Sequence, residues 1–556
     1  MDEWARVISI AMLIAVILSH GSMVAAQEAH APIYVREAPD NESDPVLFEK
    51  GRVRIYYIEP TERRSVRSIG SMDNGRSWGD DRLEFALPGQ AYHAIQVVRD
   101  DRGDMHAVTI IRAEGPRGRQ WNLWYNRSTG EQNWGEPRKI YEGYIGALRS
   151  FQQLPGGRLI LPVHVFTHYD PRPSELSDSG IDFGQGDCIV FFSDDRGNTW
   201  NRSSSRLSVP MDARRSVSRY GACEPIITRM RDGRLWMLMR NKNGQLWESF
   251  SSDDGITWTQ ALPTVLTSSD SPAATTRLAD GRLVLFLNAC QRWDNLRAYA
   301  SGGREVLHAA ISHDDGRTWR GFREVLREPT SGHNAGDRGT AYPAAVTLDD
   351  GNVLLVTGQG FAKSIIIVDP NWLDATTTED DFSDGLGQWS FYGAAGADLV
   401  SHPDSPGRQI LAIRRTNPRT QACGVWNFPS TRRGELTMRV RLDESFGGGM
   451  IALTDHFNVA ADKKAHEHGV GFMTIAPSGE IQRNVALTPG KWHELRLTWE
   501  VDRRVVVIEI DGKPRGHFML DRDTPLGINY LRVMATGDPG TGGLMLESVR
   551  FNAIHE

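Results

Sequence analysis

Cysteine is scarce in this sequence, which has only four cysteines in 556 residues: Cys188, Cys223, Cys290 and Cys423. They form no C-x-x-C pair and are too scattered for a disulfide framework or a cysteine-rich metal site. A single bridge between Cys188 and Cys223 is permitted. The only other metal-like motif, "HEHG" from His466, has no zinc-like partner spacing. We therefore predict no metal ion and no cofactor.

An excess of positive charge is also missing. The chain has 63 Lys and Arg against 70 Asp and Glu, and its formal net charge is -7. This balance lacks the basic surplus that binds phosphate backbones, so nucleic acid is excluded as an expected partner. The sequence also contains no P-loop, no Rossmann fingerprint and no serine nucleophile elbow.

Long apolar runs are absent except near the start of the chain. Residues 7–18 are apolar, and Val24 and Ala26 then form an A-x-A-like cleavage site before Gln27. The run is shorter than the roughly 20 residues that span a bilayer. We predict a signal peptide over residues 1–26, a secreted or periplasmic protein, and no membrane span after signal removal. Acidic residues before the run leave an uncleaved anchor as the alternative.

Internal repeats dominate the first two thirds of the chain. Six segments share one form, in which an apolar strand, a glycine-bearing turn and a second apolar strand follow in order, as expected for β-hairpins. They are "DPVLFEKGRVRIYYI" from Asp44, "YHAIQVVRDDRGDMHAVTII" from Tyr92, "GALRSFQQLPGGRLILPVHV" from Gly146, "CEPIITRMRDGRLWMLMR" from Cys223, "SPAATTRLADGRLVLFLN" from Ser271 and "AYPAAVTLDDGNVLLVTG" from Ala341.

A second motif, Ser-x-Asp-x-Gly-x-Ser/Thr-Trp, recurs in phase with the hairpins. Its aspartate can accept backbone N–H groups within the turn, its glycine can take a positive φ, and its tryptophan can wedge between sheets. We assign it a folding role, because the spacing also lacks the last glutamate of a calcium loop. The four copies are "SMDNGRSW" at Ser71, "SDDRGNTW" at Ser193, "SSDDGITW" at Ser251 and "SHDDGRTW" at Ser312.

These repeats predict an all-β protein with two domains. Units of about four strands are typical of propeller blades, so six hairpins predict a six-bladed β-propeller over residues 31–373. Two successive β-sandwiches are the alternative, but they would not explain the recurring turn. A Thr/Asp/Glu-rich linker is expected over 374–381. Strand-period alternation beyond it predicts an antiparallel β-sandwich of jelly-roll or lectin-like type over 382–556.

The four boxes resemble the Asp-box, or BNR, repeats of the sialidase superfamily, and the blade arrangement resembles the sialidase propeller. The resemblance covers about residues 31–373 and implies that the boxes lie on outer turns, away from the catalytic centre. The start of the second domain, "DDFSDGLGQW", resembles concanavalin-like modules. A carbohydrate-binding or docking role for the sandwich follows by analogy.

The hairpins also begin with an unusually polar set of residues, which would gather at one end of a propeller: Asp44, His93, Arg149, Glu224 and Tyr342, with Arg240 on a second strand. Glu224 and Arg240 resemble the sialidase glutamate and the second member of its arginine triad, and Tyr342 resembles the nucleophilic tyrosine. Chemistry agrees, since an anionic sugar repels a carboxylate nucleophile, whereas a phenol activated by a base can react.

The remaining parts of the family site match less well. Arg304 is the preferred third arginine, and Arg292 competes with it for the role of holding the substrate's anionic group. Ser43 stands where the first arginine of the triad is expected. No segment matches the acid/base aspartate, and Asp44 or His93 could transfer protons instead.

Together these features predict an exported glycoside hydrolase that releases a terminal, acidic sugar from a glycan. Tyr342 and Glu224 would do the chemistry with Asp44, and Arg240, Arg304, Arg292, His93 and Arg149 would bind substrate. Two alternatives stay open. One is a polysaccharide lyase acting on uronates, for which Tyr342, His93 and Arg149 could supply the parts. The other is a glycan-binding propeller without catalysis.

Overall fold

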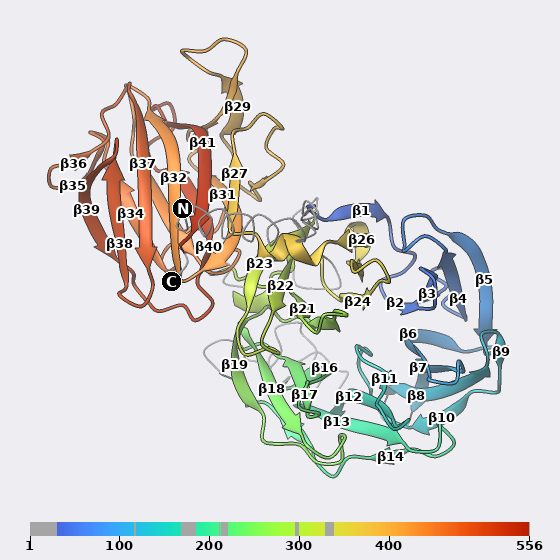
Figure 1. Ribbon diagram of the computed structural model, residues 1–556. Coiled ribbons are helices and arrows are strands. Elements are labelled where there is room, and N and C mark those ends of the chain that lie inside the picture. Colours follow the sequence, from blue (N-terminus) through green and yellow to red (C-terminus); the bar gives the residue numbers. More distant parts are fainter. Residues whose placement is uncertain are drawn as a thin grey trace, which may run out of the picture.

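The computed structural model describes residues 30–115, 118–167, 185–210, 212, 221–294, 300–328 and 339–554. The predicted signal peptide lies outside these residues. Within them the regular structure is β-strands and three short 3-10 helices, which are Ala300–Gly302, Gly360–Ala362 and Pro370–Asp374. Strands form a ring of sheets and, beside it, a separate layered body (Figure 1). The predicted fold class, a β-propeller followed by a β-sandwich, is confirmed.

The first four blades follow the chain as consecutive antiparallel sheets. Blade 1 contains β2 (Ser43–Leu47), β3 (Val53–Ile58), β4 (Ser65–Ser71) and β5 (Gly79–Ala86). Blade 2 contains β6 (Ala91–Arg99), β7 (Met105–Gly115), β8 (Gly118–Thr129), β9 (Asn133–Trp134) and β10 (Arg138–Tyr141). Blade 3 contains β11 (Gln152–Gln153), β12 (Leu159–Thr167), β13 (Gln185–Ser193), β14 (Asn201–Arg202) and β15 (Leu207–Ser208). Blade 4 contains β16 (Cys223–Arg229), β17 (Leu235–Arg240), β18 (Gln245–Ser251) and β19 (Leu262–Thr267).

The last two repeats differ from this simple pattern. The sheet of the last repeat contains β24 (Ala344–Thr347), β25 (Val353–Thr357) and β26 (Ser364–Val368), and its outer strand is β1 (Ile33–Arg36) from the start of the described chain. Ile33 pairs with Ile367, so the two ends of the propeller are held in one sheet and the ring closes. Closure in this way removes the exposed edges of an open sheet.

The fifth repeat corrects the prediction of six separate blades. Its strands are β20 (Ala274–Arg277), β21 (Leu283–Leu287), β22 (Val306–Ser312) and β23 (Arg320–Arg327). Gly321 of β23 pairs with Ser430 of the second domain, so these four strands belong to a nine-stranded sheet that runs into the sandwich. Five propeller sheets therefore stand alone, and the remaining repeat is shared between the two bodies.

The sandwich consists of two facing sheets around one apolar core. The sheet that continues from β23 contains β28 (Trp389–Ser390), β31 (Ala422–Thr431), β33 (Gly449–Thr454), β34 (Gly471–Ile475) and β40 (Ile528–Ala535). The facing sheet contains β27 (Thr377–Asp380), β29 (Ala397–Ser401), β30 (Gln409–Ile413), β32 (Arg433–Leu442), β37 (Trp492–Glu500), β38 (Val505–Ile510), β39 (Lys513–Met519) and β41 (Leu544–Ala553), and β35 (Glu480–Gln482) pairs with β36 (Val485–Ala486). Phe428 and Phe551 stack across the core with ring centroids 4.7 Å apart.

The segment predicted as a linker, 374–381, contains a strand. Its residues Thr377–Asp380 form β27, which pairs with β41. The chain therefore enters the second domain directly on a strand. No helix among the described residues is long and apolar enough to cross a membrane. All four cysteines are buried and none forms a disulfide, so the permitted bridge between Cys188 and Cys223 is absent.

The Asp-box turns are built as the sequence indicates. In the box from Ser251, the Asp253 carboxylate accepts the Thr257 backbone N–H at 2.9 Å and the Thr257 hydroxyl at 2.6 Å, and Ser251 Oγ accepts the Gly255 N–H at 2.9 Å. Gly255 has a φ of 90°, and a Cβ there would lie 2.5 Å from Ile160 of the preceding blade. The turn therefore fastens one blade to the next.

Candidate active site

Tyr342, Glu224 and Arg240 form one hydrogen-bonded cluster at the centre of the propeller. The Tyr342 hydroxyl donates to Glu224 Oε1 at 2.9 Å. Arg240 Nη1 donates to the Tyr342 hydroxyl at 3.1 Å and also to Glu224 Oε2. All three residues are less than a tenth exposed. The structure thus brings together three of the residues that the sequence pattern singles out, although Tyr342 lies 118 residues after Glu224 in the chain.

The backbone at this cluster is held in an uncommon conformation. Glu224 has a φ of 41° and Tyr342 a φ of 65°, both in the left-handed region that non-glycine residues seldom occupy. The Glu224 backbone N–H donates to His164 Nδ1 at 3.1 Å, which helps to hold the backbone in this conformation. Such strain is concentrated at functional sites, where the surrounding fold supports it. The conformation aims both side chains at one point.

Charge balance keeps Glu224 ionised although it is buried. Burial acts to raise its pKa, but the neighbouring Arg240, His164 and Arg304 outweigh burial, so the pKa of Glu224 is lowered from its ordinary value. Arg240 Nε also donates to Asp270 at 2.6 Å, and the pKa of Asp270 is lowered as well, with Arg240 the main cause that outweighs burial. An ionised Glu224 can accept the proton of Tyr342.

Two further guanidinium groups lie against the Tyr342 ring. The Cζ of Arg149 lies 5.2 Å from the ring centroid, and the Cζ of Arg304 lies 5.4 Å from it. Arg304 donates to the Asp270 carbonyl at 2.9 Å and to Gln359 Oε1 at 3.2 Å. With Arg240, three cationic side chains from three blades surround one phenol.

A cavity of about 360 Å³ opens onto this cluster. Tyr342, Glu224 and His164 line it together with His93, whose ring lies 4.3 Å from that of Trp121. His93 therefore lies in the lining of the same cavity as Tyr342 and Glu224. Burial lowers the pKa of His164 to about 4, so this imidazole is neutral near pH 7.

Sequence reasoning missed several residues of this cavity, among them His164, Glu42 and Arg63. Glu42 and Arg63 both line it, and Arg63 Nη1 donates to Asp40 at 3.2 Å. The Glu42 carboxylate pairs with Arg149, whose Nη1 lies 3.4 Å from Glu42 Oε2. Ser43, the position of the missing arginine, donates its hydroxyl to the Asp40 carbonyl at 2.8 Å and lies outside the lining. The only available signal was the acidic Glu42 immediately before a strand.

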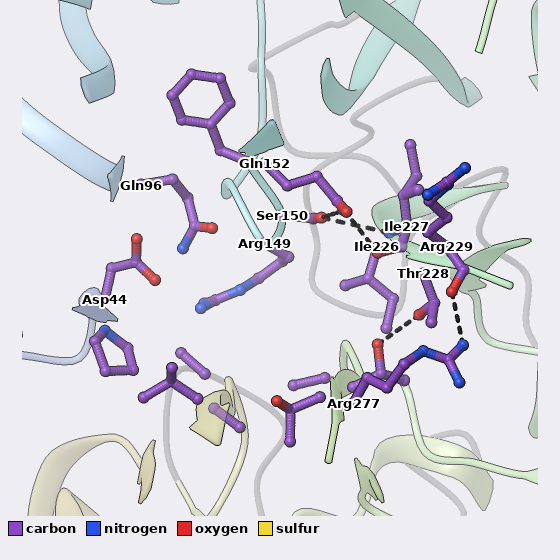
Figure 2. Close-up of a pocket in the computed structure, with 18 of the residues that line it drawn as sticks. Asp44, Gln96, Arg149, Ser150, Gln152, Ile226, Ile227, Thr228, Arg229 and Arg277 are labelled. Carbon is purple, nitrogen blue, oxygen red and sulfur yellow. Dashed lines mark hydrogen bonds between the residues drawn. The ribbon is translucent and has the colours of Figure 1, made fainter. Parts of the chain in front are cut away.

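Asp44 lies in a different cavity from the one sequence reasoning expected. It lines a larger space of about 610 Å³ between the inner strands, where Asp44, Gln96 and Arg149 point toward one another (Figure 2). Burial raises its pKa to about 7, and the Val97 N–H, which donates to Asp44 Oδ2 at 2.6 Å, offsets part of that rise. This cavity is lined by Thr228 and Val346, farther along the inner strands than Glu224 and Tyr342, so we do not assign Asp44 a catalytic role.

Arg292 also lies away from the cluster. Its Nε donates to Asp294 at 2.9 Å, and the adjacent Trp293 stacks on His468 of the sandwich with ring centroids 3.8 Å apart. The residues directly after β21, up to Asp294, are therefore held at the domain junction, and Arg304 lies near Tyr342. In the part of the chain that the structure describes, no group of three or more His, Cys, Asp or Glu residues could hold a metal ion.

Comparison with known proteins supports the reading of the repeat. Residues 97–355 match the model of the BNR repeat-like domain family. No curated protein matches the chain. Among solved structures, *Trypanosoma rangeli* sialidase in complex with 2,3-difluorosialic acid, a covalent intermediate, is 14% identical, with a TM-score of 0.42 over 95% of this chain and 92% of that one.

Two other solved structures are similar at the same level. A mutant of *Trypanosoma rangeli* sialidase displaying trans-sialidase activity is 15% identical, with a TM-score of 0.42 over 95% of each chain. A protein of unknown function from *Dyadobacter fermentans* is 16% identical, with a TM-score of 0.44 over 61% of this chain and 97% of that one. We transfer no residue role from any of them.

Proposed function

Because the propeller is sialidase-like and its residues 97–355 form a BNR repeat-like domain, we propose that this protein is a glycoside hydrolase that removes a terminal acidic sugar from a glycan. The observation that carries the proposal is the hydrogen bond from the Tyr342 hydroxyl to an ionised Glu224, 2.9 Å long. A phenol paired with a base in this way is an activated nucleophile.

In the proposed reaction, Tyr342 attacks the anomeric carbon while its proton passes to Glu224. A covalent glycosyl-tyrosine forms, and water then releases the sugar with retention of configuration. Arg240 contacts the hydroxyl directly at 3.1 Å and stabilises negative charge that develops on the phenol oxygen. A neutral nucleophile suits an anionic substrate, since two negative charges would repel each other.

The cations around the ring support the choice of an acidic sugar. Arg149, Arg240 and Arg304 approach Tyr342 from three blades, and arginine binds carboxylates through a planar pair of donors. Arg149 comes from the segment before β11, and it supplies cationic charge although Ser43 stands where an arginine is expected in blade 1.

Substitution of the nucleophile and its base tests the proposal. We expect Tyr342→Phe and Glu224→Gln each to lower turnover of reporter glycosides of sialic and uronic acids by about three orders of magnitude or more, with the fold kept. Turnover is measured by release of the reporter group, and folding by circular dichroism. Native-like activity in either variant would rule out this mechanism.

Product analysis separates hydrolysis from the lyase alternative. A lyase uses arginine to neutralise a uronate and leaves an unsaturated sugar that absorbs ultraviolet light, whereas a hydrolase leaves a saturated one. No change in any glycan of a broad panel, with retained glycan binding, would instead favour a binding propeller.

We also propose that the protein is exported and that the sandwich binds carbohydrate. The first proposal rests on the apolar run over residues 7–18 and the small residues after it. N-terminal sequencing of secreted protein should give Gln27 as the first residue. The second rests on analogy with concanavalin-like modules and is tested by glycan-array binding of the full chain.

A further inference from the structure

Hydrolysis of an unactivated glycoside needs a proton donor for the departing oxygen, and Tyr342 and Glu224 do not supply one. We propose that Glu42 is the general acid and base of this site. It lines the same cavity as Tyr342 and Glu224, directly before β2, and is 7% exposed. The inference rests on the hydrolase proposed above and names the residue that moves the proton.

The other titratable groups that line the cavity fit this role less well. Glu224 is ionised and bonded to Tyr342, so it has no proton to give in the first step. His164 is neutral near pH 7, and its Nδ1 accepts the Glu224 N–H. Arg63 is permanently charged and paired with Asp40. The remaining candidates are the Tyr144 phenol and His93, which is stacked on Trp121, and the experiment below includes His93.

The surroundings of Glu42 favour its protonated form. Burial raises the pKa of Glu42 to about 8, Arg149 and Arg63 partly offset burial, and the charges of Asp40 and Glu224 raise the pKa further. Glu42 is thus protonated and Glu224 ionised in the same cavity. Such a division of two carboxyls into an acid and a base is what proton-transfer catalysis at neutral pH requires.

Arg149 connects the acid to the nucleophile. Its Nη1 lies 3.4 Å from Glu42 Oε2, and its Cζ lies 5.2 Å from the Tyr342 ring centroid. One buried guanidinium therefore orients the Glu42 carboxyl and lies beside the reacting phenol. Once Glu42 has lost its proton, the same cation stabilises the carboxylate. Arg149 is in this respect a positioning residue.

The proposed reaction has two steps, and each transfers a proton to or from Glu42. In the first step, the Tyr342 oxygen bonds to the anomeric carbon, the glycosidic C–O bond breaks, Glu42 gives its proton to the leaving oxygen, and the phenol proton moves to Glu224. In the second, water attacks the anomeric carbon and gives a proton to Glu42, and the Tyr342 oxygen leaves and regains its proton from Glu224. The net reaction consumes one water and returns all three side chains to their starting states.

The test uses leaving groups of different acidity. We expect Glu42→Gln to lower kcat/KM about 1000-fold for the methyl glycoside of the sugar that the reporter screen identifies, and less than about 10-fold for its 4-nitrophenyl glycoside, which leaves without protonation. We expect kcat/KM of the native protein for the methyl glycoside to fall above about pH 8, and no such fall for the 4-nitrophenyl glycoside. Glu42→Asp should show the same split in smaller degree if Glu42→Gln does not fold.

Controls separate the possible failures. Glu248 is a matched control, a carboxyl whose pKa burial also raises, which accepts the Trp236 Nε1–H at 2.7 Å on the outer part of blade 4. Glu248→Gln should leave kcat/KM unchanged for both glycosides. Three results would overturn the role of Glu42 while the hydrolase stands. They are equal losses of kcat/KM on both glycosides in Glu42→Gln, no loss on either glycoside, and a leaving-group split in His93→Gln instead. If native protein cleaves no reporter, the proposed function fails and this inference fails with it.

Discussion

Buried charge at the centre of the propeller is arranged around individual residues. Arg240 is bonded at the same time to Glu224, Tyr342 and Asp270, so one guanidinium holds two carboxylates ionised where burial alone would neutralise them. Arg149 has a different setting, since its two carboxyl neighbours, Glu42 and Asp44, both have raised pKa values. Arg240 and Glu224 are therefore charged, whereas the carboxyls of Glu42 and Asp44 retain protons.

These protons give the protein a pH-dependent stability. The folded pKa values of Glu42 and Asp44, about 8 and about 7, lie above the ordinary 4.5 and 3.8, so the folded chain holds protons that the unfolded chain releases. Their contribution is fully present below about pH 4 and is lost as pH rises through 7 to 8. Each pKa unit corresponds to about 1.4 kcal/mol.

We expect Glu42→Gln and Asp44→Asn to flatten the decline of the unfolding free energy between pH 5 and 8 relative to the native protein. Urea denaturation at a series of pH values measures it. The comparison must be between variant and native, because the buried His164, with a lowered pKa, contributes the opposite slope below about pH 6.5. Parallel pH profiles for native protein and variants would contradict the prediction.

The site was predicted from the sequence in part, and the reasons differ by residue. Glu224 and Arg240 lie at the paired ends of β16 and β17, so strand pairing brings them together, whereas Tyr342 lies before β24 and was identified by the resemblance of its segment. Glu42 stands one residue before its strand, and whether a side chain there enters the cavity depends on the local chain path. Asp44 and Arg292 were also named from the sequence, and neither lines the cavity of Tyr342, because a sequence pattern does not give the depth of a residue along its strand.

At the scale of elements, an Asp-box turn joins its blade to the preceding blade. Trp319 of one box lies with its ring centroid 6.3 Å from that of Trp236 in the preceding blade. Trp200 of another lies 5.2 Å from Tyr125 in the blade before it. These contacts were predictable because the motif is local and its tryptophan has one apolar direction to fill. The pairing of β1 with β26 was not, because nothing in a short strand indicates a partner at the far end of the domain.

Removal of one box aspartate should loosen the propeller without affecting chemistry. Asp253 accepts hydrogen bonds from the Thr257 N–H, the Thr257 hydroxyl and the Ser251 hydroxyl, and these bonds lower its pKa although burial opposes them. We expect Asp253→Ala to lower the unfolding free energy by about 1–2 kcal/mol and to leave kcat/KM unchanged. Ser252→Ala, an exposed position of the same turn, is the control for chemical denaturation. Lost activity at native stability would argue for a catalytic box instead.

For the whole molecule, the junction between propeller and sandwich is built like an interior. An apolar cluster runs across it from Cys290 and Val306 of the propeller to Phe457 and Tyr530 of the sandwich. Backbone groups also pair there, since the Phe457 N–H donates to the Ala289 carbonyl at 2.8 Å and the Gln291 N–H to the Phe457 carbonyl at 2.9 Å. These contacts lie just after β21, whose end faces the same side of the ring as Arg240 at the end of β17. The sandwich is thereby fixed beside the mouth of the site.

A buried proton chain lies at the centre of this junction. Because His308 Nδ1 accepts the Ala289 N–H at 3.3 Å, its Nε2 carries the proton and donates to the Tyr530 hydroxyl at 2.5 Å. That hydroxyl donates in turn to Glu324 at 2.7 Å. Burial lowers the pKa of His308 to about 3, so the imidazole stays neutral. The hydrogen bonds therefore run in one direction, from His308 through Tyr530 to Glu324.

This architecture predicts that propeller and sandwich unfold together. Large apolar interfaces couple domains, whereas small polar ones let them melt separately. We expect calorimetry of the native chain to show one transition. Tyr530→Phe keeps the ring but leaves His308 and Glu324 without their shared partner, which should lower the unfolding free energy by about 1–3 kcal/mol. Trp492→Phe, at a partly exposed position of β37 in the facing sheet of the sandwich, should lower the unfolding free energy less. Two well-separated transitions in the native protein would show that the sandwich is an independent appendage, and its position beside the site would then carry no functional weight.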